Sequence, residues 1–295
     1  IALENPVDSS EMNPVIWIGL ARIIEEHYEN YDGFVVLHGS DTMAYTASAL
    51  SFALENLDKP VVLTGSQLPI GVIRTDGKEN FLTAIEIAGA KEEDGTPIVT
   101  EVCIYFEYKL YRGNRSHKYS AENFQAFQSP NYPILAEAGV SIKYYRDQIA
   151  GVNNEPLIVN KVFSTQVNIL PIFPGISEHV VNLVLKDEET NGIILHTYGS
   201  GNAPKFDWFL DAVKQAVDEG KFLYNVSQCL AGTVQQGRYA TSEKLAEYGV
   251  VSGKDITLEA AITKMMYLLG HNLSDDEIRY YLGNPLRGEM MSAQY

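Results

Sequence analysis

Short apolar runs alternate with amphipathic segments along most of the chain. The runs are followed by polar turns and are typical of strands buried on both faces of a sheet. The segments between them repeat apolar residues every third or fourth position, which predicts helices. Such alternation indicates an α/β fold with parallel sheets covered by helices. The predicted strands span residues 34–37, 60–64, 101–107, 167–173, 192–196 and 222–226. One predicted helix begins with Asn13 as its cap and Pro14 as its first residue, and the others span residues 42–57, 76–90, 177–186, 206–219, 241–248, 257–271 and 274–282.

The alternation stops near the middle of the chain and then begins again. Residues 151–154 are rich in Gly and Asn, which is typical of a linker. We therefore expect a parallel-sheet N-terminal α/β domain over residues 1–145, a linker over 146–166 and a second, smaller α/β domain over 167–295. In both domains we expect ligands at the turns that follow the strands, because these turns line the crevice of an open parallel sheet.

Charge and composition narrow the classes of partner. The 295 residues carry a net charge of −16, which argues against nucleic acid and anionic membrane surfaces as partners. No apolar run is long enough to span a bilayer. Both cysteines, Cys103 and Cys229, follow apolar runs, so we expect two buried thiols, no disulfide and compatibility with a reducing compartment.

Cofactor signals are weak. No pair among the six histidines has the spacing of metal ligands, so we expect no metal site. The turn at 199–201 has two of the glycines of a dinucleotide fingerprint, but Pro204 stands where the third would be. We therefore expect no cofactor, and a small molecule as the ligand.

Three polar segments from separate parts of the chain hold the candidate chemistry. They are the turn Asp8–Ser10, the turn Ser40–Thr42 after the first predicted strand, and Lys118 at the end of a basic stretch. A hydroxyl is a weak nucleophile and needs a base. Lysine can act as that base only if its charged form is disfavoured or its proton passes to a carboxylate. Asp41 is placed to hold Lys118 in this role.

Each segment also has a simpler interpretation. Ser40 or Asp41 could cap the helix that follows, as Ser and Asp commonly do. The basic stretch 109–118 could be a solvated surface loop. A lysine beside an aspartate is also the commonest inert ion pair on protein surfaces.

Four segments together resemble the L-asparaginase family of type I (cytosolic, bacterial). They are DSSEM at 8–12, HGSDTMAYTASALSFALENLDKPVVLTGSQLP at 38–69, LYRGNRSHK at 110–118 and SQCLAG at 227–232. They occur in the family's order, and the resemblance runs from Asp8 to Arg287. It implies a cytoplasmic homodimer or homotetramer that hydrolyses L-asparagine to L-aspartate and ammonia without a cofactor, with glutamine as a poorer substrate. It also implies a larger N-terminal and a smaller C-terminal α/β domain.

The resemblance assigns roles to individual residues. Ser40, Asp41 and Lys118 match the family's catalytic hydroxyl, aspartate and lysine. The substrate-binding matches are Asp8, Ser9 and Ser10 for the α-amino and α-carboxylate groups, the Ser66 backbone for the side-chain amide, and Asn202 for a residue that reaches a neighbouring subunit's pocket. The family usually has threonine in place of Ser40, so the methyl that fixes the rotamer is absent here.

Some type I members carry a second, allosteric site for asparagine. The corresponding turns hold His196, Ser227 and Cys229. An arginine is expected where His196 stands, and a neutral imidazole binds a carboxylate less well than a guanidinium does. We treat these residues as a possible regulatory site.

The family's primary nucleophile has no counterpart in residues 1–295. It is a threonine in a TGGTI turn after the first strand. We therefore expect a further strand and turn upstream of Ile1, and a slot beside the strand at 34–37. Residues 1–295 alone should be unstable and release no ammonia. Two alternatives stay open, namely the ammonia-releasing amidotransferase subunit of the same superfamily and a non-catalytic amino-acid-binding module.

Overall fold

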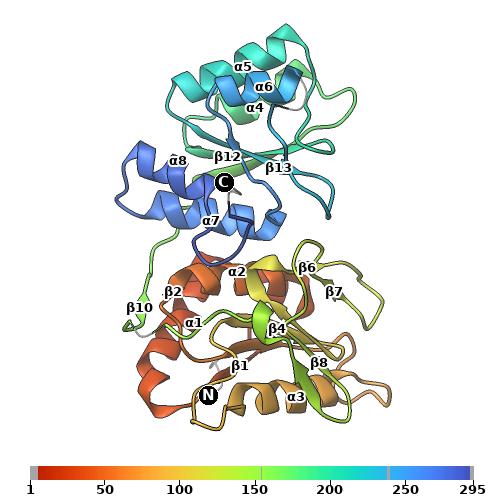
Figure 1. Cartoon of the computed structure of the whole chain (residues 1–295). Helices are drawn as coiled ribbons and strands as arrows, with labels where there is room; N and C mark the ends of the chain where they lie inside the picture. Colours follow the sequence, from red (N-terminus) through yellow and green to blue (C-terminus); the bar gives the residue numbers. More distant parts are fainter. Residues whose placement is uncertain (1–5, 154, 238–239, 293–295) are drawn as a thin grey trace. The chain divides into compact units, whose positions relative to one another are not determined.

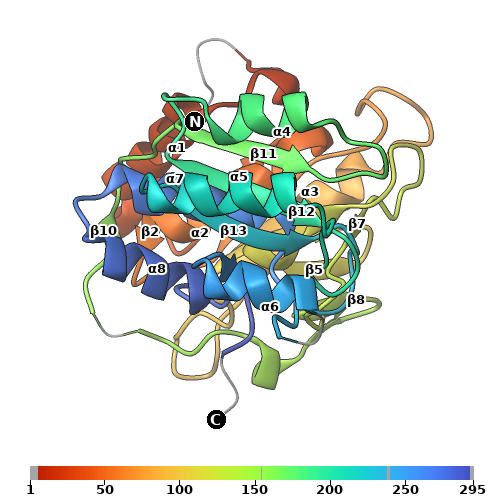
Figure 2. The same cartoon turned by 90° about the horizontal axis from the view of Figure 1, so that it is seen from above.

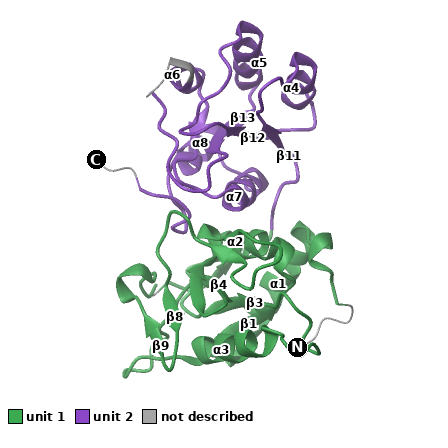
Figure 3. Cartoon of the chain, turned by 90° about the vertical axis from the view of Figure 1, so that its right-hand side faces the viewer, with its two compact units in different colours: residues 1–161 green, residues 162–295 purple. Residues whose placement is uncertain are grey.

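The computed structural model describes residues 6–153, 155–237 and 240–292. The chain divides into two compact units, 1–161 and 162–295, which Figure 3 shows in different colours. None of the helices within the described residues is long and apolar enough to cross a membrane.

Within the described residues, unit 1 is built on a six-stranded sheet with the order β1-β3-β4-β5-β8-β9. Its strands are β1 (Phe34–Leu37), β3 (Val61–Thr64), β4 (Val102–Phe106), β5 (Lys109–Arg112), β8 (Ala136–Ala138) and β9 (Ile142–Tyr144). The strands β1, β3 and β4 are parallel, and the remaining three continue the sheet in antiparallel pairing. Two short antiparallel pairs complete the unit, β2 (Leu54–Glu55) with β10 (Ile158–Val159) and β6 (His117–Lys118) with β7 (Phe127–Gln128).

Helices cover both faces of this sheet. The helices α1 (Pro14–His27) and α2 (Met43–Ala53) lie on one face, and α3 (Gly77–Gly89) lies on the other (Figures 1 and 3). Asn13 caps α1, as the sequence predicts, because its side chain accepts hydrogen bonds from two backbone N–H groups of the first turn. Every residue of α2 except Tyr45 is buried, so this helix is a rigid support for the turn that precedes it.

The antiparallel half of the sheet is a feature that the apolar pattern does not predict. The strands β4 and β5 form a hairpin whose two loop residues, Glu107 and Tyr108, have φ angles of 46° and 65°. Positive φ at both positions is typical of a type I′ turn, which usually contains Asn and Gly. Because Glu and Tyr are not typical of this turn type, the sequence does not predict the hairpin.

The basic stretch after this hairpin is not a solvated loop. Arg112 Nε lies 2.5 Å from Glu101 Oε2, and both side chains are nearly buried. The Arg112 guanidinium also lies over the ring of Tyr132, with its carbon 4.3 Å from the ring centroid. Arg115 is only 3% exposed. Two of the basic residues are therefore part of the interior of unit 1, and the solvated-loop interpretation is wrong for them.

The strand β1 is an edge strand within the described part of the chain. Phe34 and His38 donate backbone hydrogen bonds to the β3 side, so in a parallel ladder the backbone groups of Val35 and Leu37 face outward. A groove of about 700 Å³ runs along this outer edge. Apolar side chains line it from both faces of the sheet, with Ile16, Leu20 and Ile23 from α1 and Phe81 from α3.

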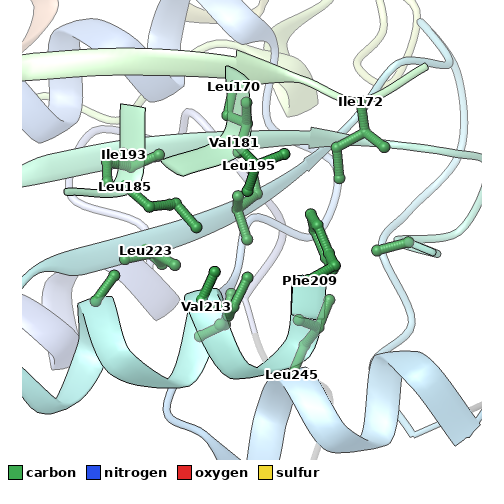
Figure 4. Close-up of a cluster of buried hydrophobic side chains, with 14 of the residues drawn as sticks. Leu170, Ile172, Val181, Leu185, Ile193, Leu195, Phe209, Val213, Leu223 and Leu245 are labelled. Carbon is green, nitrogen blue, oxygen red and sulfur yellow. The ribbon is translucent and has the colours of Figure 1, made fainter. Parts of the chain in front are cut away.

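Unit 2 contains a parallel sheet with the order β11-β12-β13-β14. The strands are β11 (Val167–Pro171), β12 (Gly192–Thr197), β13 (Phe222–Ser227) and β14 (Val251–Ser252). One face carries α4 (Glu178–Leu185), α5 (Asp207–Asp218) and α6 (Ala240–Glu247), and the other carries α7 (Leu258–Gly270) and α8 (Asp275–Gly283) (Figures 1 and 2). Figure 4 shows the core under α4 and α5, where Leu195, Phe209 and Val213 pack together. The predicted α/β class is therefore confirmed in both units.

A buried ion pair ties the end of unit 2 to α7. Lys264 Nζ lies 2.5 Å from Glu289 Oε1, and both side chains are fully buried. The lysine also donates to the Asn284 carbonyl at 2.7 Å. The carboxylate accepts from the backbone N–H groups of Leu286 and Arg287. The charged atoms of Lys264 and Glu289 thus all have partners. The hydrogen bonds to Glu289 hold the backbone of the segment after α8.

Replacing Lys264 with Met should lower the free energy of unfolding by about 3–5 kcal/mol, because Glu289 is left as an unpaired buried charge. The double variant Lys264→Met/Glu289→Gln should recover part of this loss, since the amide is neutral and still accepts hydrogen bonds. Urea unfolding followed by circular dichroism measures both. The control is Lys214→Met in the exposed Lys214–Asp218 pair of α5, which should leave the stability nearly unchanged because solvent screens the pair. A Lys264→Met effect as small as the control's contradicts this account.

Candidate active site

The structure brings Ser40, Asp41 and Lys118 together at the carboxyl end of β1. Ser40 and Asp41 belong to a single 3-10 turn, Ser40–Thr42, between β1 and α2. Lys118 arrives on β6 from far along the chain. Its Nζ donates to Ser40 Oγ at 2.9 Å and to Asp41 Oδ1 at 2.5 Å. The lysine side chain is 16% exposed and that of Asp41 is 68% exposed, so the pair lies at the edge of an accessible surface.

Neither Ser40 nor Asp41 caps the following helix. No side chain accepts a capping hydrogen bond at the start of the 3-10 turn or of α2. Asp41 is paired with Lys118, and the Ser40 hydroxyl donates to Gln67 Oε1 at 3.0 Å. The polar side chains of this turn therefore interact with one another and with distant residues, and the capping interpretation is wrong.

The turn Asp8–Ser10 packs against this cluster. A Cβ atom on Gly39 would lie 2.5 Å from Ser9 Oγ, so glycine is required for the close approach of the two turns. Thr42 Oγ1 donates to the Ser9 carbonyl at 2.6 Å. Ser9 is buried, whereas Asp8 and Ser10 are exposed. Two segments that are separate in sequence thus form one polar surface.

Asp8 is held as an anion on that surface. The backbone N–H and the hydroxyl of Ser10 donate to Asp8 Oδ1 at 2.8 and 2.7 Å. These hydrogen bonds hold the pKa of the Asp8 carboxyl below its usual range. An exposed carboxylate that stays charged is suited to bind an ammonium group.

The turn after β3 supplies Ser66 and a residue that the sequence does not single out, Gln67. The Gln67 backbone N–H donates to both oxygens of Asp76 at 3.0 Å, and Leu68 N donates to Oδ1 at 3.2 Å. Asn80 Nδ2 donates to the Gly65 carbonyl at 2.9 Å. Two side chains at the start of α3 therefore hold this turn beside Ser40. The motif GSQ at the end of a strand was the available signal for Gln67.

His38 fixes the backbone that leads into Ser40. Its Nδ1 lies 2.6 Å from the Gly39 carbonyl, and because a carbonyl only accepts, Nδ1 carries the proton. Nε2 then accepts from Thr46 Oγ1 at 2.9 Å, and Trp17 Nε1 donates to the same hydroxyl at 3.1 Å. Burial lowers the pKa of His38, which favours this neutral form.

The predicted regulatory residues lie on neighbouring strand ends in unit 2. His196 is on β12, and burial lowers its pKa. Ser227 ends β13, donates to the Gly199 carbonyl at 2.5 Å and accepts from Cys229 N at 3.0 Å. The Cys229 thiol is exposed, so the expectation of two buried thiols is wrong for it, whereas Cys103 is buried. Cys229 follows the end of β13 and therefore lies beyond the core.

Asn202 also lies in unit 2, in the turn after β12. Its backbone is paired with Tyr198, whose N–H donates to the Asn202 carbonyl at 2.9 Å. The side-chain oxygen Oδ1 is buried and accepts no hydrogen bond from the described residues. A contribution of Asn202 to a neighbouring subunit's pocket stays a prediction.

Comparison with known proteins identifies the family. The family model described as "Asparaginase, N-terminal" matches residues 2–150, and that described as "Glutaminase/Asparaginase C-terminal domain" matches residues 166–282. The chain belongs to the asparaginase family. L-asparaginase 1 of Escherichia coli (strain K12) is 45% identical over 284 residues, which cover 96% of this chain and 82% of the relative. The crystal structure of L-asparaginase I from Vibrio cholerae matches with a TM-score of 0.89 at 41% identity and covers 98% of this chain and 85% of that one.

A more distant relative corresponds to the alternative function. A glutamyl-tRNA(Gln) amidotransferase subunit of Pyrococcus abyssi is 31% identical over 292 residues, which cover 96% of this chain but 64% of the relative. Its identity is lower than the 45% of L-asparaginase 1 of Escherichia coli. Among residues 6–153, 155–237 and 240–292, no group of three His, Cys, Asp or Glu side chains is placed to hold a metal ion.

Proposed function

We propose that the protein hydrolyses L-asparagine to L-aspartate and ammonia. The single observation that carries this proposal is the hydrogen-bonded cluster of Ser40, Asp41 and Lys118 beside the anionic Asp8–Ser10 turn. An amino-acid amide has an ammonium group, a carboxylate and a reactive amide, and this surface offers a partner for each. Family membership supports the same reaction.

In this proposal the Asp8–Ser10 turn holds the amino-acid end of the substrate. The Asp8 carboxylate binds the α-ammonium group and the Ser9 hydroxyl binds the α-carboxylate, while the Ser10 hydroxyl and backbone N–H hold Asp8 in place. The backbone of Ser66, on the turn after β3, faces the side-chain amide. The substrate is thus held at both ends between two turns, which places the amide carbon near Ser40 and Lys118.

The chemical steps follow acyl transfer to a hydroxyl. The attacking oxygen bonds to the amide carbon, the C–N bond breaks, and ammonia leaves with a proton from the site. Water then cleaves the ester to give aspartate and restore the hydroxyl. We assign the handling of these protons to Ser40, Lys118 and Asp41, which polarise first the hydroxyl and then the water.

We further propose that the attacking hydroxyl is a threonine on an extended segment in the groove along β1. The outward backbone groups of Val35 and Leu37 and the apolar lining from α1 and α3 fit a strand buried on both faces. A parallel strand there ends at the level of His38, so its following turn lies beside Ser40.

Three finer properties belong to the same proposal. The protein acts as a homodimer or homotetramer, in which Asn202 reaches a neighbouring subunit. It works in the cytoplasm, which free thiols at Cys103 and Cys229 favour. His196, Ser227 and Cys229 form a regulatory site for asparagine, supported by their adjacent strand ends.

Ammonia release from asparagine and from glutamine tests the reaction directly. Asparagine should be turned over faster, because the extra methylene of glutamine displaces its amide carbon from the site. The active form should carry a threonine hydroxyl on a segment in the groove along β1, and intact mass should verify its composition. Full activity of a form without such a threonine would make Ser40 the nucleophile, and binding without ammonia release would favour the amino-acid-binding module.

In the active form, Asp8→Ala should raise KM for asparagine about 10- to 100-fold, because a charge-assisted bond to the substrate ammonium is lost. The chain offers a matched control in Asp94, which accepts from the backbone N–H and hydroxyl of Thr96 at 3.0 and 2.6 Å in the same kind of turn. Asp94→Ala should leave KM unchanged. Steady-state kinetics measure both, and equal effects of the two variants would remove Asp8 from the binding site.

Lys118 and Asp41 should act as a unit. Lys118→Met and Asp41→Asn should each lower kcat by at least about 100-fold, and the double variant should lose little more. Lys118→Arg should be nearly as damaging as Lys118→Met, because a guanidinium does not give up its proton. Lys91→Met, in the exposed Lys91–Asp32 pair, is the control and should keep normal kcat. Losses that multiply in the double variant would indicate independent residues.

A further inference from the structure

The hydroxyl of Ser40 lies between two hydrogen-bond partners, of which one can only donate and the other accepts. The Lys118 ammonium only donates, so Ser40 Oγ accepts from it at 2.9 Å. The Ser40 proton is then donated to Gln67 Oε1 at 3.0 Å. A hydroxyl oxygen has two lone pairs, and this arrangement leaves the second one unused by Lys118 and Gln67. That lone pair is the part of Ser40 that can accept a hydrogen bond from an attacking hydroxyl or from water.

The orientation of the Gln67 amide is itself determined. Its Nε2 donates to the backbone carbonyl of Asn123 at 3.0 Å. Because a carbonyl cannot donate, turning the amide over would place two acceptors against each other, and Oε1 therefore faces Ser40. The Gln67 backbone is held by the two oxygens of Asp76, which is only 9% exposed. Both ends of the Gln67 side chain are thus fixed before any ligand binds.

A serine at position 40 needs such a partner more than a threonine does. The β-branched threonine has few χ1 rotamers available, whereas serine can place its hydroxyl in any of three staggered positions. Only one of these lies between Lys118 and Gln67. Without a second partner, only the hydrogen bond from Lys118 would orient the Ser40 hydroxyl. The second lone pair of its oxygen would then not keep one direction.

We propose that Gln67 is a positioning residue that fixes the rotamer of the Ser40 hydroxyl through Oε1 and so replaces the restraint that a β-methyl would give. The inference rests on the proposed function, because it assumes that Ser40 takes part in the reaction. Gln67 holds the serine and does not contact the substrate. Its loss therefore affects kcat far more than KM.

A double-variant cycle tests this inference in the active form of the enzyme. Gln67→Met keeps the length of the side chain but removes Oε1, and it should lower kcat about tenfold with KM changed less than about twofold. In a Ser40→Thr background, the same Gln67→Met change should lower kcat by less than about threefold, since the methyl now restrains χ1. Gln125→Met, an exposed glutamine in the same loop as Asn123, is the matched control and should have normal kcat.

The outcomes separate this inference from the proposed function. Gln67→Met could lower kcat equally in the Ser40 background and in the Ser40→Thr background. Loss of the hydrogen bond from Gln67 to Asn123, or a general loss of stability, would then explain the lower kcat, and the positioning role would be overturned. The thermal unfolding midpoints of all variants show whether a variant has lost stability. A Ser40→Ala variant should lose at least about 100-fold in kcat. Normal kcat in that variant would remove Ser40 from the proposed mechanism, and the role of Gln67 would be overturned with it.

Discussion

The parallel register of β1 against β3 is the constraint on which the site depends. Leu37 is paired with Thr64, and His38 N donates to the Thr64 carbonyl at 2.8 Å, so both strands end at the same level. A Cβ atom on Gly65 would lie 2.1 Å from the His38 carbonyl oxygen. The two turns therefore approach more closely than any side chain on Gly65 would allow. A slip of one residue would reverse which face each β1 side chain meets and would separate Ser40 from Gln67.

Buried polar groups hold the turns of the candidate site, and exposed carboxylates lie at its surface. Asp76 is nearly buried but accepts hydrogen bonds from two backbone N–H groups and from Asn80 Nδ2, so its desolvation is compensated. The neutral His38 holds the other turn in the same way. Asp8 and Asp41 are instead exposed. The buried support is thus satisfied internally, and the two exposed carboxylates lie at its surface.

The parts of the fold that the sequence predicts are those with a regular period. The parallel strands, their helices and the meeting of Ser40, Asp41 and Lys118 follow from alternation, strand-end turns and family resemblance. The hairpin at Glu107 and Tyr108 was missed because its positive φ angles are imposed by the surrounding sheet and not by turn residues. Gln67 was missed for a different reason. Its role depends on the register between two strands and on Asn123, and no local pattern contains either.

Within the part of the chain that the structure describes, the outer edge of β1 lies next to the candidate active site. Leu37 is 63% exposed, and apolar side chains line the groove on both faces of this edge. Leaving such an edge open exposes backbone donors and acceptors together with apolar surface, which is costly and favours association with other strands. The same groove reaches His38 and Gly39, next to the turn that carries Ser40. A segment that pairs with this edge therefore covers both its backbone groups and its apolar surface, next to the turn that carries Ser40.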